Sequence, residues 1–341
     1  MKNPIARRSA WTMAALCLLG TATTTAVAMG TMTADALPLT TIAEIPLGGK
    51  PTRLDYASLD ARRHLLFIAH LGDSEVVVFD TETRRVVARI PGVGRVHGVL
   101  AIPELGTVYA SATGTNEVVA IDATTRKITG RMPGGVYPDG LAYAPEVHKL
   151  YVSDEHGGTD TVIDTRSNTV VATVKIGGDI GNTQYDPVSH HIYVNAQSTA
   201  ELVEIDPVTD AIVRRIPIPG ARENHGLLID SGQRRAFIAC QGNNQLIVLD
   251  LTTGAVLATF GVAKDPDVIA LDPDRHDLYV AGESGEVSLF RLGPGSVTKV
   301  AEQELAAYAH VVSVNPANHE VYFPLQNQGG RAVLRVSMPI H

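Results

Sequence analysis

From about residue 41 to the C-terminus, short apolar runs alternate with polar turns at a fixed period. Each period contains an aromatic residue followed by small or apolar residues, at Phe67, Tyr109, Tyr151, Tyr193, Phe237, Tyr279 and Tyr322. The spacings between these aromatic residues are 42, 42, 42, 44, 42 and 43. A period of this length is typical of a repeat architecture in which each unit packs against the next.

Each period predicts four short strands and no helix. Runs rich in Val, Ile and Tyr are bounded by Gly, Pro and Asp, which are strand and turn signals. Four strands in each of seven units predict an all-β fold, a seven-bladed β-propeller with four-stranded blades. No linker interrupts the repeats, so residues 37–341 are predicted to form a single domain.

The two ends of the repeat array predict how the ring closes. The last unit contains only three strands, and the segment Thr41–Gly48 resembles a fourth strand without a blade of its own. We expect this N-terminal strand to complete blade 7, which would hide the exposed sheet edges.

Two smaller features recur with the blades. Aspartates that are followed three residues later by Thr or Ser are expected to be structural, since their short side chains bond nearby backbone in hairpin turns: Asp80, Asp122, Asp164, Asp206 and Asp250. Histidines three residues before the aromatic residue are expected in the hairpin turns of the opposite face: His64, His148, His190, His276 and His319.

The repeat resembles a known family. Tyr-Val strands, Asp-x-x-Thr turns and the run from Thr161 to Val174 are similar to those of YVTN-repeat, YncE-like β-propellers of bacterial envelopes. The resemblance covers nearly the whole chain after residue 36. It implies the propeller fold and says little about function, because propellers carry many unrelated activities.

The first 36 residues have the layout of a secretory signal peptide. A basic start (Lys2, Arg7, Arg8) precedes an apolar run, and small-residue cleavage patterns end at Ala28 and Ala36. The apolar run is too short to cross a bilayer. We therefore expect a signal peptide over residues 1–36, with cleavage after Ala28 or Ala36, and a periplasmic or secreted protein.

Charge and motifs exclude several classes of function. The chain has a net charge of −8, which becomes −10 when residues 1–36, with three cations and one anion, are removed. No nucleic acid partner is expected, because phosphate binding needs a basic surface. The sequence contains no G-x-S-x-G motif, phosphate-binding loop or dinucleotide fingerprint.

The candidate chemistry lies at the position twelve residues before each repeat aromatic, here called the ring positions. This position falls at the start of the innermost predicted strand, so all seven side chains should surround the tunnel axis. In chain order the ring positions hold Asp55, His97, Asp139, Gly181, His225, Asp267 and His310. The same spacing gives two evenly spread trios, one of histidines and one of aspartates.

Either trio is a candidate metal site. Imidazole suits Zn, Cu or Fe, whereas carboxylates suit Ca or Mn. We expect His97, His225 and His310 to be metal ligands, and Asp55, Asp139 and Asp267 to be ligand, base or other catalytic groups. The alternative is that these polar residues line a wet tunnel and bind nothing; in that case Asp139 is a turn residue of Pro-Asp-Gly.

Further candidates share the same face. The residues two positions before the ring include Arg53, Arg95, Glu223 and Tyr308, which are predicted to contact substrate. Arg53 and Arg95 lie on adjacent blades and could grip an anionic group, because a guanidinium matches a carboxylate. Glu155 lies in a longer loop of blade 3 and is a candidate general acid or base.

Two functions from different classes fit this pattern. One is a metal-dependent hydrolase or lyase of a small substrate such as a lactone, with a divalent ion (Zn, Cu, Fe, Mn or Ca) as cofactor. The other is a non-catalytic envelope protein that binds a partner protein through a face of the propeller. In both cases a monomer without a membrane span is expected.

Overall fold

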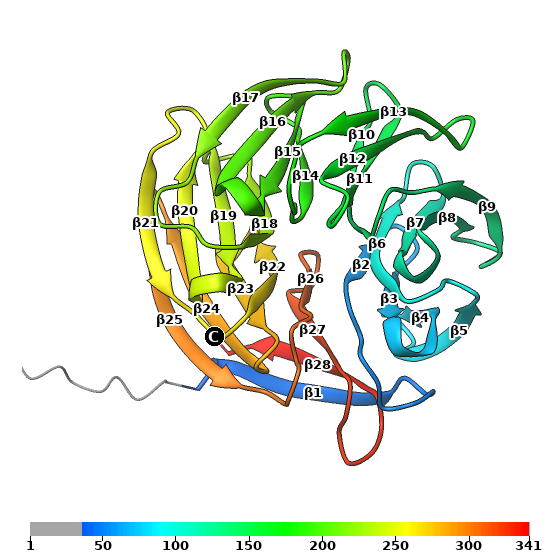
Figure 1. Cartoon of the computed structure of the whole chain (residues 1–341). Coiled ribbons are helices and arrows are strands. Elements are labelled where there is room, and N and C mark those ends of the chain that lie inside the picture. The colour runs from blue at the N-terminus through cyan, green and yellow to red at the C-terminus, as the bar shows by residue number, and fades with distance from the viewer. Residues whose placement is uncertain (1–35, 341) are drawn as a thin grey trace, which may run out of the picture. The chain divides into compact units, whose positions relative to one another are not determined.

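The chain is arranged as a ring of seven blades (Figure 1). The computed structural model describes residues 36–340, and the described residues belong to one compact unit. Each blade is a four-stranded antiparallel sheet, so the sequence-based prediction of a seven-bladed β-propeller is confirmed. The predicted signal peptide lies outside the described residues, apart from Ala36. None of the described helices is long and apolar enough to cross a membrane.

Blades 1 to 4 follow one another along the chain, each from its inner to its outer strand. Blade 1 comprises β2 (Ala57–Asp60), β3 (Leu65–His70), β4 (Glu75–Asp80) and β5 (Arg85–Pro91). Blade 2 comprises β6 (Val96–Ile102), β7 (Thr107–Ala112), β8 (Glu117–Asp122) and β9 (Ile128–Pro133). Blade 3 comprises β10 (Pro138–Ala144), β11 (Lys149–Asp154), β12 (Thr159–Asp164) and β13 (Thr169–Lys175). Blade 4 comprises β14 (Thr183–Asp186), β15 (His191–Ala196), β16 (Glu201–Asp206) and β17 (Ala211–Pro217).

The remaining blades bring the chain back to its start. Blade 5 comprises β18 (Asn224–Asp230), β19 (Arg235–Cys240), β20 (Gln245–Asp250) and β21 (Val256–Gly261). Blade 6 comprises β22 (Pro266–Asp272), β23 (Asp277–Gly282), β24 (Glu286–Gly293) and β25 (Ser296–Glu304). Blade 7 comprises β26 (Ser313–Asn315), β27 (Glu320–Leu325), β28 (Val333–Pro339) and β1 (Leu39–Pro46). Short 3₁₀ turns follow the second strand in four blades: η1 (Leu71–Asp73), η2 (Thr113–Thr115), η3 (Gln197–Thr199) and η4 (Gln241–Asn243).

The repeat aromatic residues form the core of the blades. All seven lie on the second strand of their blade and are at most 1% exposed: Phe67, Tyr109, Tyr151, Tyr193, Phe237, Tyr279 and Tyr322. Their neighbours in the buried clusters come from two adjacent sheets, for example Tyr151 with Ile180 and Val194 of blade 4. The aromatic period of the sequence is therefore the period of packing between blades.

The N-terminal strand closes the ring as predicted. β1 pairs antiparallel with β28, from Leu39 opposite Pro339 to Pro46 opposite Val333. Blade 7 is thus built from both ends of the repeat array, and Figure 1 shows β1 and β28 side by side. This pairing satisfies the backbone groups of β28 that would otherwise form an open sheet edge.

Deletion of residues 37–47 is expected to lower both the melting temperature and the soluble yield. The deletion removes the buried side chains of Leu37 and Leu47 and exposes the edge of β28. Circular dichroism melting of the deleted and full-length proteins checks this. An unchanged melting curve would show that β1 does not close the ring.

The recurring turn residues have the structural roles predicted for them. The carboxylate of Asp80 accepts hydrogen bonds from the backbone N–H groups of Glu82 and Thr83, at 3.0 and 2.8 Å. Asp122, Asp164, Asp206 and Asp250 accept equivalent bonds. The recurring histidines of the opposite face lie in the first hairpin turns with positive φ: His64, His148, His190, His276 and His319.

One buried aspartate breaks the pattern of the blades. Asp160 is 0% exposed and stands opposite Ser153 on the third strand of blade 3. At this position the other six blades carry a fully buried apolar residue: Val76, Val118, Leu202, Leu246, Val287 and Leu334. One oxygen of Asp160 has no hydrogen-bond partner among the described residues, and the other is 3.4 Å from the Thr183 hydroxyl. Burial raises the pKa of Asp160 well above its usual range.

Asp160→Val is therefore expected to stabilise the protein, by an amount that grows with pH. The pKa of Asp160 is higher in the folded than in the unfolded chain, so the wild type loses stability as pH rises from about 4 towards the raised pKa. The loss approaches about 1.4 kcal/mol per pH unit, and valine does not titrate. Chemical denaturation of both proteins between pH 5 and 8 checks this, with the exposed Asp274→Asn as control. A gain that does not change with pH would contradict the account.

Candidate functional site

The ring positions stand outside the regular strand ladders, and this aims their side chains at the axis. In blades 2, 3, 5 and 6 the register of the inner strand shifts at the ring residue, between Val96 and Val99 and between Asn224 and Gly226, for example. In blades 1, 4 and 7 the inner strand begins two or three residues after the ring residue. β-bulges re-aim side chains in this way next to functional sites.

The residue two positions before the ring adopts a left-handed backbone in five of the seven blades. Arg95, Tyr137, Glu223, Asp265 and Tyr308 have φ between 45 and 64°. This conformation is unfavourable for a residue with a side chain, so the surrounding blade must hold it. The tight bend carries the chain from the outer loop into the tunnel.

Glycine beside the ring residue is required by close packing of the inner strands. A Cβ on Gly98 would lie 2.1 Å from the backbone oxygen of Asp139, and one on Gly226 would lie 2.0 Å from that of Asp267. The His-Gly pairs at His97 and His225 are thus explained by space. Close packing also explains why glycine occupies ring position 181, since a Cβ on Gly181 would lie 2.5 Å from the backbone oxygen of His225.

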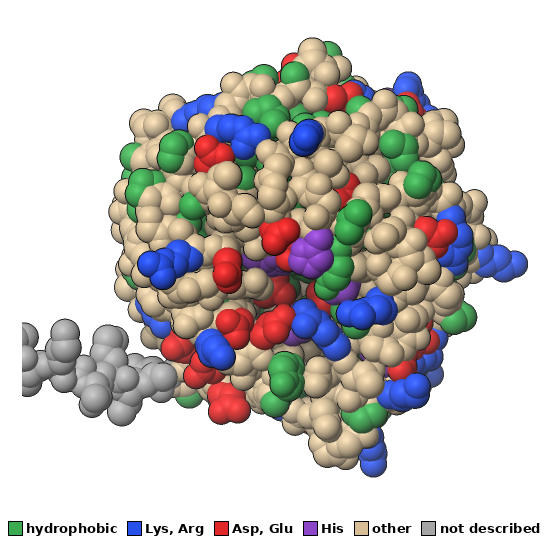
Figure 2. Space-filling model, in the orientation of Figure 1, with side chains coloured by type: hydrophobic (Ala, Val, Ile, Leu, Met, Phe, Trp, Pro, Cys, Tyr) green, Lys and Arg blue, Asp and Glu red, His purple; other side chains and the backbone are tan. Residues whose placement is uncertain are grey.

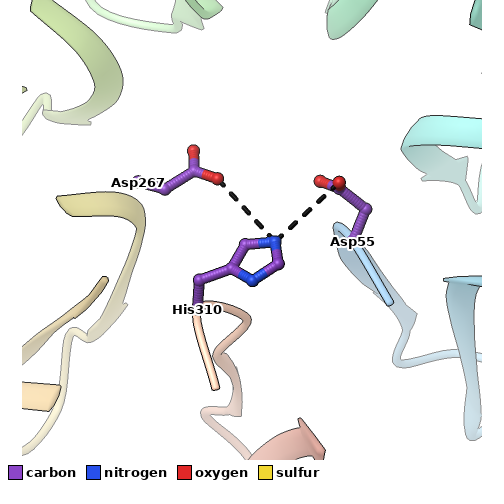
Figure 3. A group of neighbouring side chains, drawn as sticks. All are labelled: Asp55, Asp267 and His310. Atoms are coloured by element: carbon purple, nitrogen blue, oxygen red, sulfur yellow. Dashed lines mark ion pairs between the residues drawn. The ribbon is translucent and has the colours of Figure 1, made fainter. Parts of the chain in front are cut away.

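Three ring residues converge on one point (Figure 3). Asp55, Asp267 and His310 come from blades 1, 6 and 7 and offer ligand atoms that all lie within 4.8 Å of one another. His310 Nε2 is 3.8 Å from Asp55 Oδ2 and 3.9 Å from Asp267 Oδ2. All three are at most 3% exposed.

The imidazole of His310 is held with Nε2 facing the two carboxylates. Its Nδ1 is 3.2 Å from the backbone oxygen of Tyr308 and donates to it, which leaves the lone pair of the neutral ring on Nε2. Nε2 is buried and has no hydrogen-bond partner among the described residues. A buried nitrogen without a partner is costly, so a ligand at this point would satisfy it.

The other two histidines make different contacts. His97 Nδ1 lies 3.0 Å from the Arg95 oxygen, and its Nε2 lies 3.1 Å from the Tyr137 hydroxyl. His225 Nδ1 lies 2.9 Å from Gln197 Nε2, and its own Nε2 faces the carboxylates of Asp139 (3.6 Å) and Asp267 (3.5 Å). Neither belongs to the group around His310, so the structure does not bring the three predicted histidine ligands to one point.

Burial and charge shift the ring groups in opposite directions. Burial favours neutral His310, but the carboxylates of Asp55 and Asp267 outweigh it and raise the pKa of His310. Burial likewise favours protonated Asp55, but His310, His97 and Arg53 outweigh it and lower the pKa of Asp55.

On the opposite side of the ring, the pKa of Asp139 is shifted in the opposite direction from that of Asp55. Burial raises the pKa of Asp139 well above its usual range, and the charges of Asp55 and Glu155 add to the shift. Burial alone would lower the pKa of His225, but Asp267 and Asp139 raise it. Burial lowers the pKa of His97. Strong shifts of both signs in one cavity are typical of functional sites.

Two polar residues at the site were missed from the sequence. The Tyr56 hydroxyl donates to Asp267 Oδ1 at 2.9 Å and accepts a bond from Asn182 Nδ2 at 2.6 Å. Both residues directly follow a ring position, where the other blades carry glycine or valine. That contrast was available in the sequence, but the contact across the tunnel between blades 1 and 4 was not.

The predicted substrate contacts are divided between the cavity and its rim. A cavity of about 160 Å³ at this mouth is lined by Arg53, Glu155 and most ring residues. Arg53 is already engaged, since it donates to Asp55 at 3.0 Å and pairs with Glu283 at 2.9 Å. Arg95, Glu223 and Tyr308 are exposed at the rim. Figure 2 shows acidic and histidine side chains gathered at the centre of this face.

The comparisons with known proteins support the fold and give no information about the site. No family model and no curated protein matches the sequence. Among solved structures, the chain is similar to hydrazine synthase of Kuenenia stuttgartiensis, with a TM-score of 0.71 and 14% identity over 90% of this chain and 97% of that chain. It is also similar to U3-55K (TM-score 0.73, 12% identity, 86% of this chain and 98% of that one).

A third similar structure is a chain of a mitotic checkpoint complex, with a TM-score of 0.73 and 11% identity over 98% of both chains. At such low identities these likenesses establish the β-propeller fold alone. The resemblance to YVTN-repeat propellers is more specific than the fold, and these structures do not test it.

A second group of possible ligands lies in blade 1, formed by His70, Asp73 and Glu75. Arg89 contacts Glu75 directly and lies 3.7 Å from Asp73, and it donates to the backbone oxygen of Leu47. Arg89 pairs with both carboxylates of this group, whereas Arg53 pairs with only one of the two carboxylates near His310. We therefore interpret the group as an ion-pair network that fastens the closing segment to blade 1.

Proposed function

We propose that this protein is a metal-dependent hydrolase or lyase of a small substrate, with Asp55, Asp267 and His310 as the metal ligands. The observation that carries the proposal is the convergence of their ligand atoms within 4.8 Å around a buried Nε2 that has no partner among the described residues. The exported, YncE-like character inferred from the signal sequence and the Tyr-Val repeats belongs to the same proposal.

The donor set fits a divalent transition metal. One imidazole nitrogen and two carboxylate oxygens suit Zn²⁺, Fe²⁺ or Mn²⁺. Three protein donors would leave coordination positions free, as in catalytic sites. A bound ion would supply Lewis-acid chemistry, polarising a substrate carbonyl and acidifying a water molecule.

Neighbouring residues orient the three proposed ligands by hydrogen bonds. Arg53 holds Asp55, and the Tyr56 hydroxyl holds the Oδ1 atom of Asp267, so both carboxylates are oriented before any ligand arrives. Such outer contacts tune a metal site. His310 is oriented in the same sense by the Tyr308 carbonyl.

His225 is placed to transfer a proton within the same cavity. Its ring is held by Gln197, and its Nε2 lies 3.5 Å from Asp267, which is itself one of the proposed ligands. The carboxylates of Asp267 and Asp139 raise the pKa of His225 against the effect of burial, and an imidazole is the side chain most often used for proton transfer. We assign His225 the role of general acid or base.

A metal-dependent activity screen tests the function. We expect turnover of one class in a panel of lactones, carboxylic esters and β-elimination substrates, abolished by a chelator and restored by Zn²⁺ or Mn²⁺. His225→Gln should lower turnover by about 10²–10⁴-fold, the usual contribution of general acid–base catalysis, while leaving metal content unchanged. Full metal loading without turnover on any substrate would favour the non-catalytic binding protein.

A further inference from the structure

The wall of the mouth cavity opposite His310 is acidic and, among the described residues, carries no lysine or arginine. Among residues 36–340, five carboxylates line the cavity, and Arg53 is the one arginine in its lining. Arg53 pairs with Asp55 and Glu283 on blades 1 and 6. On blade 3, across the ring from His310, Asp139 and Glu155 have no lysine or arginine partner among the described residues.

Asp139 has an oxygen that the described residues leave unsatisfied. Its Oδ2 lies 3.6 Å from His225 Nε2, whereas its Oδ1 is buried without a hydrogen-bond partner. The residue is 4% exposed and lines the cavity. A buried acceptor without a donor is costly, and the cost is removed when a ligand donates to it.

Glu155 lines the same cavity as Asp139. It is half-buried and makes no side-chain hydrogen bond to the described residues. Its backbone N–H donates to the Tyr137 oxygen at 2.9 Å, which fixes the loop over blade 3. The two carboxylates therefore come from two levels of one blade, one deep and one near the surface.

An aromatic wall adjoins the two carboxylates. The Tyr137 ring lies between the rings of His97 and His156, with centroid distances of 5.1 and 4.5 Å. These tilted aromatic rings give one side of the polar cavity a less polar surface. They suit the methylene groups of a ligand whose charged end reaches Asp139.

We propose that Asp139 and Glu155 form a subsite for the ammonium group of a small amine. An ammonium carries three N–H donors and no acceptor, which matches the unpaired oxygen of Asp139. Its positive charge would also favour the ionised form of Asp139, which burial disfavours. The substrate class rests on the proposed function: it is then an ester or lactone that bears a primary amine. The amine would lie on blade 3, and the reacting carbonyl would face Asp55, Asp267 and His310 across the axis.

This subsite differs from the anionic substrate expected from Arg53 and Arg95. The nitrogen atoms Nε and Nη2 of Arg53 already contact carboxylates, and Arg95 is exposed outside the cavity lining. The charge of the lining therefore matches a cationic group better than an anionic one.

Calorimetric titration with three compounds of equal length tests the proposal: 1,4-diaminobutane, 1,4-butanediol and succinate. We expect the diamine alone to bind, and its Kd to rise at least about tenfold in Asp139→Asn and in Glu155→Gln, since hydrogen bonds to charged groups are the strong ones. Glu104→Gln, in an exposed hairpin turn of the opposite face, is the matched control and should bind as the wild type does.

The titration also separates this proposal from the metal site. Diamine binding that survives both blade 3 variants but disappears in Asp267→Asn would place the cation at the metal ligands and overturn the subsite. Equal binding of the diol would overturn it too. Metal content measured on the same samples tests the proposed function separately, because Asp139→Asn and Glu155→Gln leave all three proposed metal ligands in place.

Discussion

Gly226→Ala should destabilise the protein by about 3 kcal/mol or more, at the upper end of the usual cost of overpacking. The new Cβ would lie 2.0 Å from the backbone oxygen of Asp267 and 3.0 Å from the Ala239 side chain. Backbone cannot move aside as a flexible side chain does, so β18 and β22 must separate. Because Asp267 itself is displaced, the variant should also lose affinity for the metal. Denaturant unfolding at equilibrium measures the change in free energy.

Gly261→Ala is the matched control for this substitution. Gly261 ends the outer strand β21, and a Cβ there would meet no atom within 4 Å. Its free energy of unfolding should stay the same or rise by about 0.4–1 kcal/mol, because alanine reduces the freedom of the unfolded chain. A Gly226→Ala protein as stable as this control would mean that the inner strands are not packed as closely as described.

His310→Ala and Asp267→Asn should each remove the stabilisation that a bound metal gives. With Zn²⁺ or Mn²⁺ at a hundred times its Kd, the wild type should gain about 2.7 kcal/mol relative to the chelated protein. Each variant loses one of only three protein donors, so this gain should fall close to zero. Thermal unfolding with and without chelator measures the gain within each protein, which separates metal binding from any general effect of the substitution.

Two further variants test whether the loss of metal binding is specific to the proposed site. His276→Ala, in an exposed hairpin turn of the opposite face, should keep the full metal-dependent gain. Tyr56→Phe keeps all three ligands but removes the hydroxyl that holds Asp267, so its metal Kd should rise by about 10–100-fold. A chelator effect that persists in His310→Ala would mean that the metal lies elsewhere.

The fold follows from the sequence because its main signals are local and repeated. An aromatic residue every 42 to 44 positions marks the buried second strand of each blade, and turn aspartates mark its hairpins. Even the closure by β1 could be predicted, since a strand was missing at one end and left over at the other. These features need no knowledge of where one blade lies relative to another.

The site could be predicted only in part, because its contacts cross the tunnel. The period places seven residues around one axis, but it does not give their heights or tilts. The evenly spread histidines therefore looked equivalent, but their contacts differ. His97 bonds Tyr137, His225 Nε2 faces Asp139 and Asp267, and His310 Nε2 faces Asp55 and Asp267. The hydrogen bond from Tyr56 to Asp267 joins residues 211 positions apart, so no local sequence pattern predicts it.

Close packing explains the glycines that follow His97 and His225. Each is required because the backbone oxygen of the next blade comes within about 2 Å of its Cβ position. The neighbouring histidines are brought into the tunnel by the same bulges.

The most direct test is the metal content of the chain purified without chelator or affinity tag, measured by elemental mass spectrometry on the wild type, His310→Ala and His97→Ala. We expect about one equivalent of a divalent transition metal in the wild type and in His97→Ala, and none in His310→Ala. A wild type that takes up no metal on titration, or a His97→Ala protein that loses it together with His310→Ala, would contradict the assignment of Asp55, Asp267 and His310 as the metal ligands.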